Sequence, residues 1–381
     1  MDRIESINTE RIEWCCAERG TALQGVAAAT GISDSTLHRV MEGEGGLTFR
    51  QLQSLATYFN RGVLFFLEPG RVNERRLYTP QFRTLTSQKP DLSPKVKDLI
   101  EKAEWFRDVF LHLQEELGTV RSEFSPPDVD PSDVQVAARE MRRWLGLRDN
   151  NSFETYREAV ETKGVLVLRS MGYAGAWQFP RESTVAGFSL YFELCPVIVV
   201  RKQEFEARQV FTLIHELGHI VLHEGSFIDN DEDLFHYQGR ERDANRFAGH
   251  VLVPKAFLDQ INDRSRPQNT SSYDDWLREY RDRWGVSGEV ILRRLLDVGR
   301  LEADQYEAYR KWRARAHVPL PKRGSRQYRH REPIHIFGQS YVRSVFDALY
   351  AKRITLAKAS SYLDNLKVSD LHELEAHLAN S

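Results

Sequence analysis

The sequence is poor in cysteine and has no excess of charge of either sign. Only three cysteines occur in 381 residues, and because Cys15 and Cys16 are adjacent while Cys195 is distant, no disulfide framework can be inferred. None belongs to a C-x-x-C pair, which excludes a thiolate zinc finger. The net charge of -2 gives no global reason to expect nucleic-acid binding, so local charge has to decide that question.

Long hydrophobic runs are absent as well. No apolar run reaches the roughly 20 residues of a membrane-spanning helix, and residues 1–18 alternate charged and apolar side chains without a signal-peptide core. We therefore expect a cytoplasmic protein without a membrane partner. The contents of 41% hydrophobic and 28% charged residues are typical of a globular protein, and 381 residues predict two or three domains.

The residue pattern predicts a multidomain fold. Residues 1–70 should form an all-α module of short helices and tight turns. Residues 71–130 combine a polar, proline-bearing linker with one long amphipathic helix over 95–117. Residues 131–300 have an α+β pattern, and residues 301–381 contain a basic segment followed by C-terminal helices.

Apolar periodicity and β-branched runs locate the elements of the second half of the chain. Strands are expected at 164–169, 185–190 and 196–201. Helices are expected at about 132–145, 152–162, 204–223, 239–252, 255–262, 273–284, 287–298, 338–351 and 355–363.

The helix over 204–223 contains His215-Glu-Leu-Gly-His219. Two histidines four residues apart differ by about 40° around a helix, so both project from one face. Glu216 lies about 100° from His215, beside that face, where a carboxylate can take a proton from water that a zinc ion activates. Because the rest of this helix is apolar, the polar residues inside it need a reason.

A catalytic zinc site usually has three protein ligands and one open position. No third histidine stands six residues after His219, where a metzincin would have it. Glu241, at the start of the next expected helix, is the better candidate, with a surface glutamate as the alternative. His223 lies on the same face as His219, but a fourth ligand would close the site, so we expect it to line the helix end or to hydrogen-bond locally. Asn245, one turn after Glu241, could orient a ligand histidine.

These residues carry a family resemblance. Phe211-Thr-Leu-Ile-His-Glu-Leu-Gly-His-Ile-Val-Leu-His223, with Glu241-Arg-Asp-Ala-Asn-Arg-Phe-Ala-Gly-His-Val-Leu-Val-Pro254, resembles the ImmA/IrrE family of zinc metallopeptidases. The resemblance implies a zincin-like α+β domain in which His215, His219 and Glu241 bind Zn²⁺ in a gluzincin-like set and Glu216 is the general base. Ala248-Gly249-His250 departs mildly from the Ala-Ala that family members have after the phenylalanine.

An oxyanion formed during peptide hydrolysis also needs a hydrogen-bond donor besides the metal. The sequence does not choose among the candidates, which are Tyr237, His236, Tyr173 and His250.

Residues 9–67 resemble the Xre (Cro/C1-type) helix-turn-helix domain, through Leu23-Gln-Gly-Val-Ala-Ala-Ala-Thr-Gly-Ile-Ser33 and the helix that follows. The contacts that this helix offers to DNA or to a partner are Ser33, Ser35, Thr36, His38 and Arg39. Residues 1–70 hold six arginines and no lysine against nine acidic residues, a net charge of -3. Because lysine and arginine supply most of the affinity for DNA, docking to a protein, such as another Xre-type repressor, competes with operator binding.

The segment 310–331 carries nine lysines or arginines, with Trp312 and Tyr328 between them. This composition suits a single-stranded nucleic acid, although a solvated basic loop is the more common explanation.

Taken with the resemblance, the sequence predicts a cytoplasmic zinc endopeptidase fused to a helix-turn-helix module. Its expected substrate is an Xre-type repressor or antitoxin, cleaved to derepress a stress, mobile-element or toxin–antitoxin operon. The alternatives are a helix-turn-helix transcription regulator with a structural or sensory zinc site, and a toxin held by its partner. A homodimer is plausible for an Xre-type module, and nothing else in the sequence indicates one.

Overall fold

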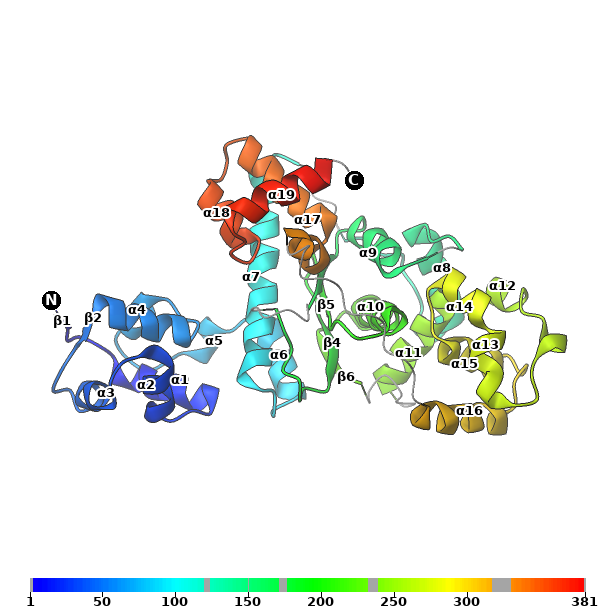
Figure 1. Cartoon of the computed structure of the whole chain (residues 1–381), viewed down its shortest axis with the longest axis horizontal. Helices are drawn as coiled ribbons and strands as arrows, with labels where there is room; N and C mark the ends of the chain where they lie inside the picture. Colours follow the sequence, from blue (N-terminus) through cyan, green and yellow to red (C-terminus); the bar gives the residue numbers. More distant parts are fainter. Residues whose placement is uncertain are drawn as a thin grey trace. The chain divides into compact units, whose positions relative to one another are not determined.

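The computed structural model describes residues 3–119, 124–149, 151–170, 177–231, 239–316 and 330–379 (Figure 1). The chain forms two compact units, residues 1–101 and residues 102–381. The further domain boundaries expected near residues 70, 130 and 300 remain predictions.

The first unit is a bundle of short helices around its own apolar core. Its main elements are α1 (Thr9–Arg19), α2 (Leu23–Thr30), α3 (Asp34–Met41), α4 (Phe49–Tyr58), the 3₁₀ helix η1 (Val63–Phe66) and the two-residue strands β1 (Arg3–Ile4) and β2 (Leu47–Thr48). Side-chain caps begin three of these helices: Asn8 caps α1, Ser33 caps α3 and Thr48 caps α4. The pair α2 and α3, joined through Gly31 at φ 70°, fits a helix-turn-helix.

The segment expected to be a linker contains two helices instead. These are α5 (Glu74–Leu77) and α6 (Pro80–Gln88), and α6 begins with Thr79 as its cap and Pro80 in its first turn. Phe82 and Leu85 are buried, and Phe82 stacks on Tyr78 with 4.1 Å between ring centroids. The polar composition of the segment gave no indication of a helix with this short apolar face.

The second unit is built around a four-stranded sheet in the order β3-β5-β4-β6. The strands are β3 (Leu166–Arg169), β4 (Val185–Leu190), β5 (Val197–Val200) and β6 (Phe227–Asn230). β3 and β5 are parallel, and the other two pairs are antiparallel. Every residue of β3, β4 and β5 is buried, as is typical of strands covered on both faces.

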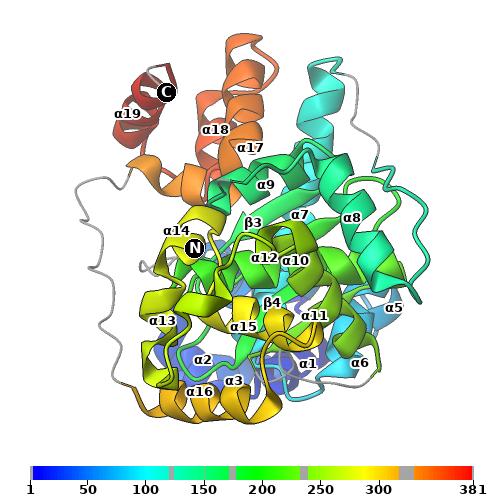
Figure 2. The same cartoon turned by 90° about the vertical axis from the view of Figure 1, so that its right-hand side faces the viewer.

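Helix α10 (Glu206–His223) packs against β4 and β5, and α11 (Gly239–Leu252) packs against α10. Figure 2 shows these two helices in front of β4. Helix α8 (Val134–Leu145) contacts α11, and α9 (Phe153–Glu161) contacts α10 and β3. The shared core includes Leu213 and Leu217 of α10 and Phe247 of α11, so α10 is surrounded by protein over most of its length.

The remaining helices extend this unit. They are α12 (Lys255–Leu258), α13 (Tyr273–Trp276), α14 (Arg278–Trp284), α15 (Gly288–Asp297), α16 (Ala303–Arg315), α17 (Glu332–Tyr350), α18 (Leu356–Tyr362) and α19 (Val368–Ala379), with 3₁₀ turns η3 (Asp263–Ser265) and η4 (Thr270–Ser272). The aromatic rings of Phe106, Phe337 and Tyr341 pack together and join α17 to α7 (Pro94–Glu116).

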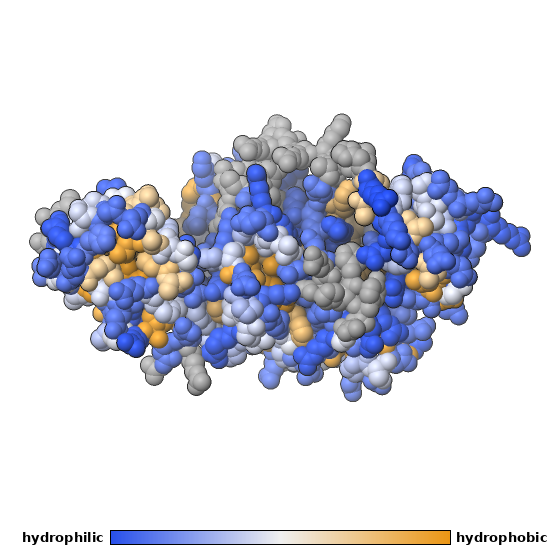
Figure 3. All heavy atoms as spheres, turned by 90° about the horizontal axis from the view of Figure 1, so that it is seen from below, coloured by the Kyte–Doolittle hydropathy of each residue, from blue (hydrophilic) through white to orange (hydrophobic). Residues whose placement is uncertain are grey.

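Most of the expected strands and helices are present within six residues of their expected ends, and β4 and α11 have the expected ends. The sequence did not predict β6, α16 or α19. Helix α17 has a kink at Gly338, whose φ of 80° and ψ of 163° are not helical, and the helix expected from residue 338 corresponds to the part after this kink. No helix of the described residues is long and apolar enough to span a membrane. The face in Figure 3 is mainly hydrophilic with small hydrophobic patches.

Candidate metal centre

Helix α10 places two histidines in the interior of the second unit. His215, Glu216 and His219 are fully buried, in a helix whose other buried positions are mostly apolar. Their four-residue spacing brings the two Nε2 atoms to 3.0 Å from each other, which agrees with the expectation from helix geometry. Two imidazole nitrogens therefore converge on one point inside a largely apolar core.

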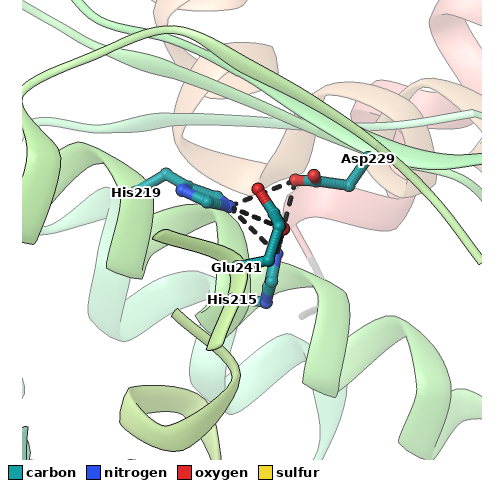
Figure 4. A group of neighbouring side chains, drawn as sticks. All are labelled: His215, His219, Asp229 and Glu241. Atoms are coloured by element: carbon teal, nitrogen blue, oxygen red, sulfur yellow. Dashed lines mark hydrogen bonds and ion pairs between the residues drawn. The ribbon is translucent and has the colours of Figure 1, made fainter. Parts of the chain in front are cut away.

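Two carboxylates from other elements meet these nitrogens (Figure 4). Glu241 Oε2 lies 3.4 Å from His215 Nε2 and 3.5 Å from His219 Nε2, and Asp229 Oδ2 lies 3.3 Å from each of them. One ligand atom from each of the four residues fits within 4.8 Å of the others, so His215, His219, Asp229 and Glu241 form a group that could hold a metal ion.

Glu241 reaches the histidines because α11 approaches α10 closely. The approach occurs at Gly218, where an added Cβ would lie 3.0 Å from Phe247 Cδ1 and 3.5 Å from Ala244 Cα. A side chain at position 218 would crowd the Phe247 ring, so glycine favours this close approach of the two helices. Glu241 stands one turn before Ala244, in the first turn of α11, and this position directs its carboxylate to the cluster.

Asp229 is the residue that the sequence did not predict. It belongs to β6, a four-residue strand that starts four residues after α10 ends. The alternation in Phe227-Ile-Asp-Asn is too short to identify a strand or to assign the face of its side chains. The sequence shows only that an aspartate follows His223 by six residues, and its burial is known from the structure alone.

The donor set fits a divalent metal ion. Ligand atoms about 2.0–2.1 Å from a tetrahedral zinc are about 3.3–3.4 Å apart. The four histidine–carboxylate distances are 3.3–3.5 Å, the two histidine nitrogens are 3.0 Å apart, and all four atoms lie within 4.8 Å of one another. Asp229 Oδ2 and Glu241 Oε2 are buried and accept no hydrogen bond from the described residues. Such buried, unsatisfied carboxylate oxygens are costly unless a cation compensates them.

The electrostatics of the cluster also favour positive charge. Burial by itself would lower the pKa of His215, but the carboxylates of Asp229 and Glu241 outweigh burial and raise it to about 9. Burial would raise the pKa of Asp229, but the adjacent imidazoles of His215 and His219 hold it well below its usual value. A divalent cation would supply this positive charge in place of protons, with the histidines neutral and both carboxylates ionised.

Glu216 lies beside the cluster and not in it. Its carboxylate faces β4, because a Cβ added at Gly187 would lie 3.0 Å from Glu216 Oε1. Burial, and then the charge of Asp229, raise the pKa of Glu216 well above its usual value, while the neighbouring Ser189 hydroxyl opposes the shift. A buried carboxyl group with a raised pKa next to a metal centre is suited to proton transfer.

Two further residues support His219. The His223 and His219 Nδ1 atoms are 3.0 Å apart, within hydrogen-bonding distance, so His223 contacts a ligand's outer nitrogen instead of joining the four-residue group. Burial lowers the pKa of His223 to about 4, with the positive charge of His219 as a smaller cause. Phe227 stacks on the His219 ring, with centroids 4.1 Å apart. These contacts restrict the orientation of the imidazole.

The other residues singled out by the sequence lie elsewhere. Asn245 stands one turn after Glu241 and is partly buried. His250 is nine residues after Glu241 on α11, about 14 Å along the helix axis, and burial and Arg294 lower its pKa to about 4. This separation argues against His250 as an oxyanion donor. Tyr173, His236 and Tyr237 lie outside the described residues.

The first unit presents the expected contact helix α3. Ser35, His38 and Arg39 are exposed on it. The Ser33 hydroxyl accepts a hydrogen bond from the Thr36 backbone and lies 2.8 Å from the Thr36 hydroxyl, so these two side chains cap the helix as well as border its surface.

Only the ends of the basic segment 310–331 are described, since 317–329 fall outside the described residues. The N-terminal end is the last part of α16. There Arg310 pairs with Glu289, Lys311 with Glu307 and Arg313 with Asp274. These three cations are therefore already engaged by acidic side chains.

Residues 180–296 match the family model described as the IrrE N-terminal-like domain, Peptidase_M78. The matched segment contains the whole cluster and Glu216. The match supports the resemblance to the ImmA/IrrE family and points to a domain of the metallopeptidase type. The first unit and the chain beyond residue 296 lie outside it. No curated protein matches the chain significantly.

Proposed function

We propose that this chain is a zinc-dependent endopeptidase that cleaves a regulatory protein. The observation that carries the proposal is the buried convergence of His215, His219 and Glu241 with Glu216 beside them, within a segment that matches a metallopeptidase family model. His215, His219 and Glu241 would hold the metal. The same residue types in the same arrangement serve peptide hydrolysis in gluzincins.

A zinc ion in this site would act as a Lewis acid that activates water and polarises the peptide carbonyl. Glu216 takes the proton from the attacking water on its carboxylate and delivers it to the amide nitrogen of the departing peptide. Its raised pKa makes the second transfer easier near neutral pH. The packing around α10 keeps bulk water away from the buried side of the cluster.

The first unit would select the substrate. Within this unit, residues 1–70 have a net charge of -3, and the acidic Asp34 and Glu42 stand at the two ends of α3. Both features weaken the case for DNA phosphates as the main partner of α3. We propose that α3 docks an Xre-type repressor or antitoxin, through exposed residues that include Ser35 and His38. Cleavage of that partner would derepress its operon.

The decisive experiment offers the protein a purified Xre-type regulator as substrate, beginning with any that is encoded next to its gene. The purified regulator is incubated with wild-type protein and with Glu216→Gln, and the products are analysed by mass spectrometry. We expect new termini with the wild type, lost on chelation and restored by Zn²⁺, and a loss of roughly 10²–10⁴-fold in the variant, which should retain its metal. Glu224→Gln, the same exchange at an exposed glutamate at the end of α10, is the matched control.

The result separates the alternatives. Cleavage by Glu216→Gln at the wild-type rate would disprove the hydrolytic role of this residue. A stable complex with the regulator and no cleavage would favour a toxin held by its partner.

A second function is favoured by one observation. The carboxylate of Asp229 completes a set of four protein ligands, and closed four-ligand sites are typical of structural zinc. A helix-turn-helix regulator with a structural or sensory metal would have such a site. Metal bound as tightly by Glu216→Gln as by the wild type, with no cleavage of any partner, would support this alternative.

A further inference from the structure

We propose that Asp229 is a ligand that closes the metal site in the resting molecule, so that a peptide reaches the metal only after the Asp229 carboxylate has moved away. The proposal rests on the peptidase function proposed above, and adds its regulation. Asp229 is not part of the His215–His219 motif, and a catalytic site with Glu241 as its third ligand does not require it.

The register of the sheet decides where Asp229 points. Asp229 is directly opposite Gly187 in the antiparallel pair of β6 and β4, and opposed residues place their side chains on the same face of a sheet. An added Cβ at Gly187 would point at Thr212 and Glu216 of α10. Phe227, two residues before Asp229, also faces α10, where it stacks on His219. Asp229 is therefore held on the metal side of the sheet.

A β-bulge lies at this point of the sheet. Val185 pairs with Asn230 and Gly187 with Asp229, so that Ala186 is an extra residue on β4. Bulges bend a strand locally and change the direction of neighbouring side chains, and they are frequent next to active sites. The backbone irregularity falls at the pair that contains Asp229.

Asp229 and Glu241 occupy equivalent positions toward the histidines. Their nearest oxygens are 3.3 Å and 3.4–3.5 Å from the two Nε2 atoms, and both sets of distances match the edges of a tetrahedron around one ion. The Asp229 side chain is only 3% exposed, compared with 22% for Glu241. Geometry thus gives no reason to count Glu241 as a ligand and to leave Asp229 out.

The number of donor atoms leads to the same assignment, since one atom from each of four side chains lies within 4.8 Å of the others. Active zinc peptidases keep one position open, and here a protein oxygen stands at that position. The arrangement is closed, and its opening requires displacement of Asp229.

The test uses full-length protein loaded with Co²⁺ and compares wild type with Asp229→Ala and Asp229→Asn. Asp231→Asn is the matched control, since Asp231 lies two residues further on and accepts a hydrogen bond from Gln203. Visible absorption reports the coordination of Co²⁺, with and without acetohydroxamate as an exogenous metal-binding probe. Competition with a chelator gives the metal affinity, and circular dichroism checks that each variant is folded.

In the wild type and in Asp231→Asn we expect the spectrum of four-coordinate Co²⁺. Acetohydroxamate should leave this spectrum unchanged, even at concentrations that saturate the metal site of Asp229→Ala. Asp229→Ala should still bind one Co²⁺, at least about tenfold more weakly. Asp229→Asn keeps the shape of the side chain, and it should behave in the same direction if the alanine variant does not fold. A wild-type spectrum that responds to the probe as Asp229→Ala does, or equal affinities in the two proteins, would overturn the proposal.

Cleavage of the regulator, measured in parallel, separates this inference from the proposed function. If the spectra behave as expected and neither wild type nor Asp229→Ala cleaves, Asp229 is a metal ligand and the peptidase function is wrong. If the wild type cleaves and its site is already open to the probe, the peptidase function stands and the closing role of Asp229 is wrong.

Discussion

Gly187 and Glu216 are in contact across the boundary between β4 and α10. A Cβ on residue 187 would lie 3.0 Å from Glu216 Oε1, 2.9 Å from the Val199 carbonyl oxygen and 2.6 Å from Thr212 Cγ2. The missing side chain of Gly187 thus leaves room for the carboxylate to which we assign proton transfer. This contact connects the sheet with the chemistry of the site.

Gly187→Ala should therefore damage both stability and activity. Overpacking of this kind costs about 1–3 kcal/mol of unfolding free energy, and relief by a movement of Glu216 would lower cleavage while metal affinity stays nearly unchanged. Urea unfolding and cleavage of the regulator measure the two effects. Gly62→Ala, at a glycine with open space around it, should be close to neutral, and equal behaviour of the two variants would show that the Gly187 contact is not tight.

His223→Ala should weaken metal binding. The variant removes the group 3.0 Å from His219 Nδ1, and loss of a partner that orients a ligand histidine typically costs 10–100-fold in affinity. Competition with a chromophoric chelator measures this loss. The control is His372→Ala, at an exposed histidine. Identical metal affinities for the two variants would show that His223 does not help to hold the metal ligands in place.

Removal of the metal should destabilise the second unit. Three acidic side chains and two histidines would then face one another in a buried site without the cation. A ligand present at 1,000 times its Kd stabilises the folded state by about 4 kcal/mol, so chelation should lower the melting temperature by several degrees, and Zn²⁺ should restore it. His215→Ala should show little response to either reagent. A wild type that melts at the same temperature with and without chelator would argue against a metal site.

Glu161 should make stability depend on pH. Its side chain is only 10% exposed and lies next to Arg157, whose Nε donates a 2.8 Å hydrogen bond to it. Burial, opposed by Arg157, raises the pKa of Glu161 from 4.5 to about 7. Because the folded state binds the proton more tightly, this contribution to stability is complete below pH 4.5 and is lost as the pH rises to about 7, with an upper limit of about 3 kcal/mol.

Urea unfolding of wild type and Glu161→Gln between pH 4.5 and 8 tests this prediction, since the amide cannot titrate and the difference between the two proteins isolates Glu161. The exposed Glu158 gives the control Glu158→Gln. Parallel pH profiles for Glu161→Gln and wild type would contradict the assignment.

Local sequence alone was enough to predict the helix of the metal centre. The angle between His215 and His219 follows from the helix repeat, and the side position of Glu216 follows from the same repeat. The apolar positions of this helix predicted that it would be buried. Glu241 depended on more than local geometry: spacing left it as one candidate, and the family resemblance favoured it.

Tertiary structure decided what local periodicity cannot encode. Gly218 allows α11 to approach α10 and so brings Glu241 to the histidines, and the pairing of Gly187 with Asp229 across the sheet turns Asp229 to the same point. The register of a strand is set by its partner, and a shift by one residue would turn Asp229 to the opposite face. For this reason the sequence determined a helix with two histidines and a neighbouring carboxylate, while only the packed sheet decided that two carboxylates meet these histidines in a group that could hold a metal ion.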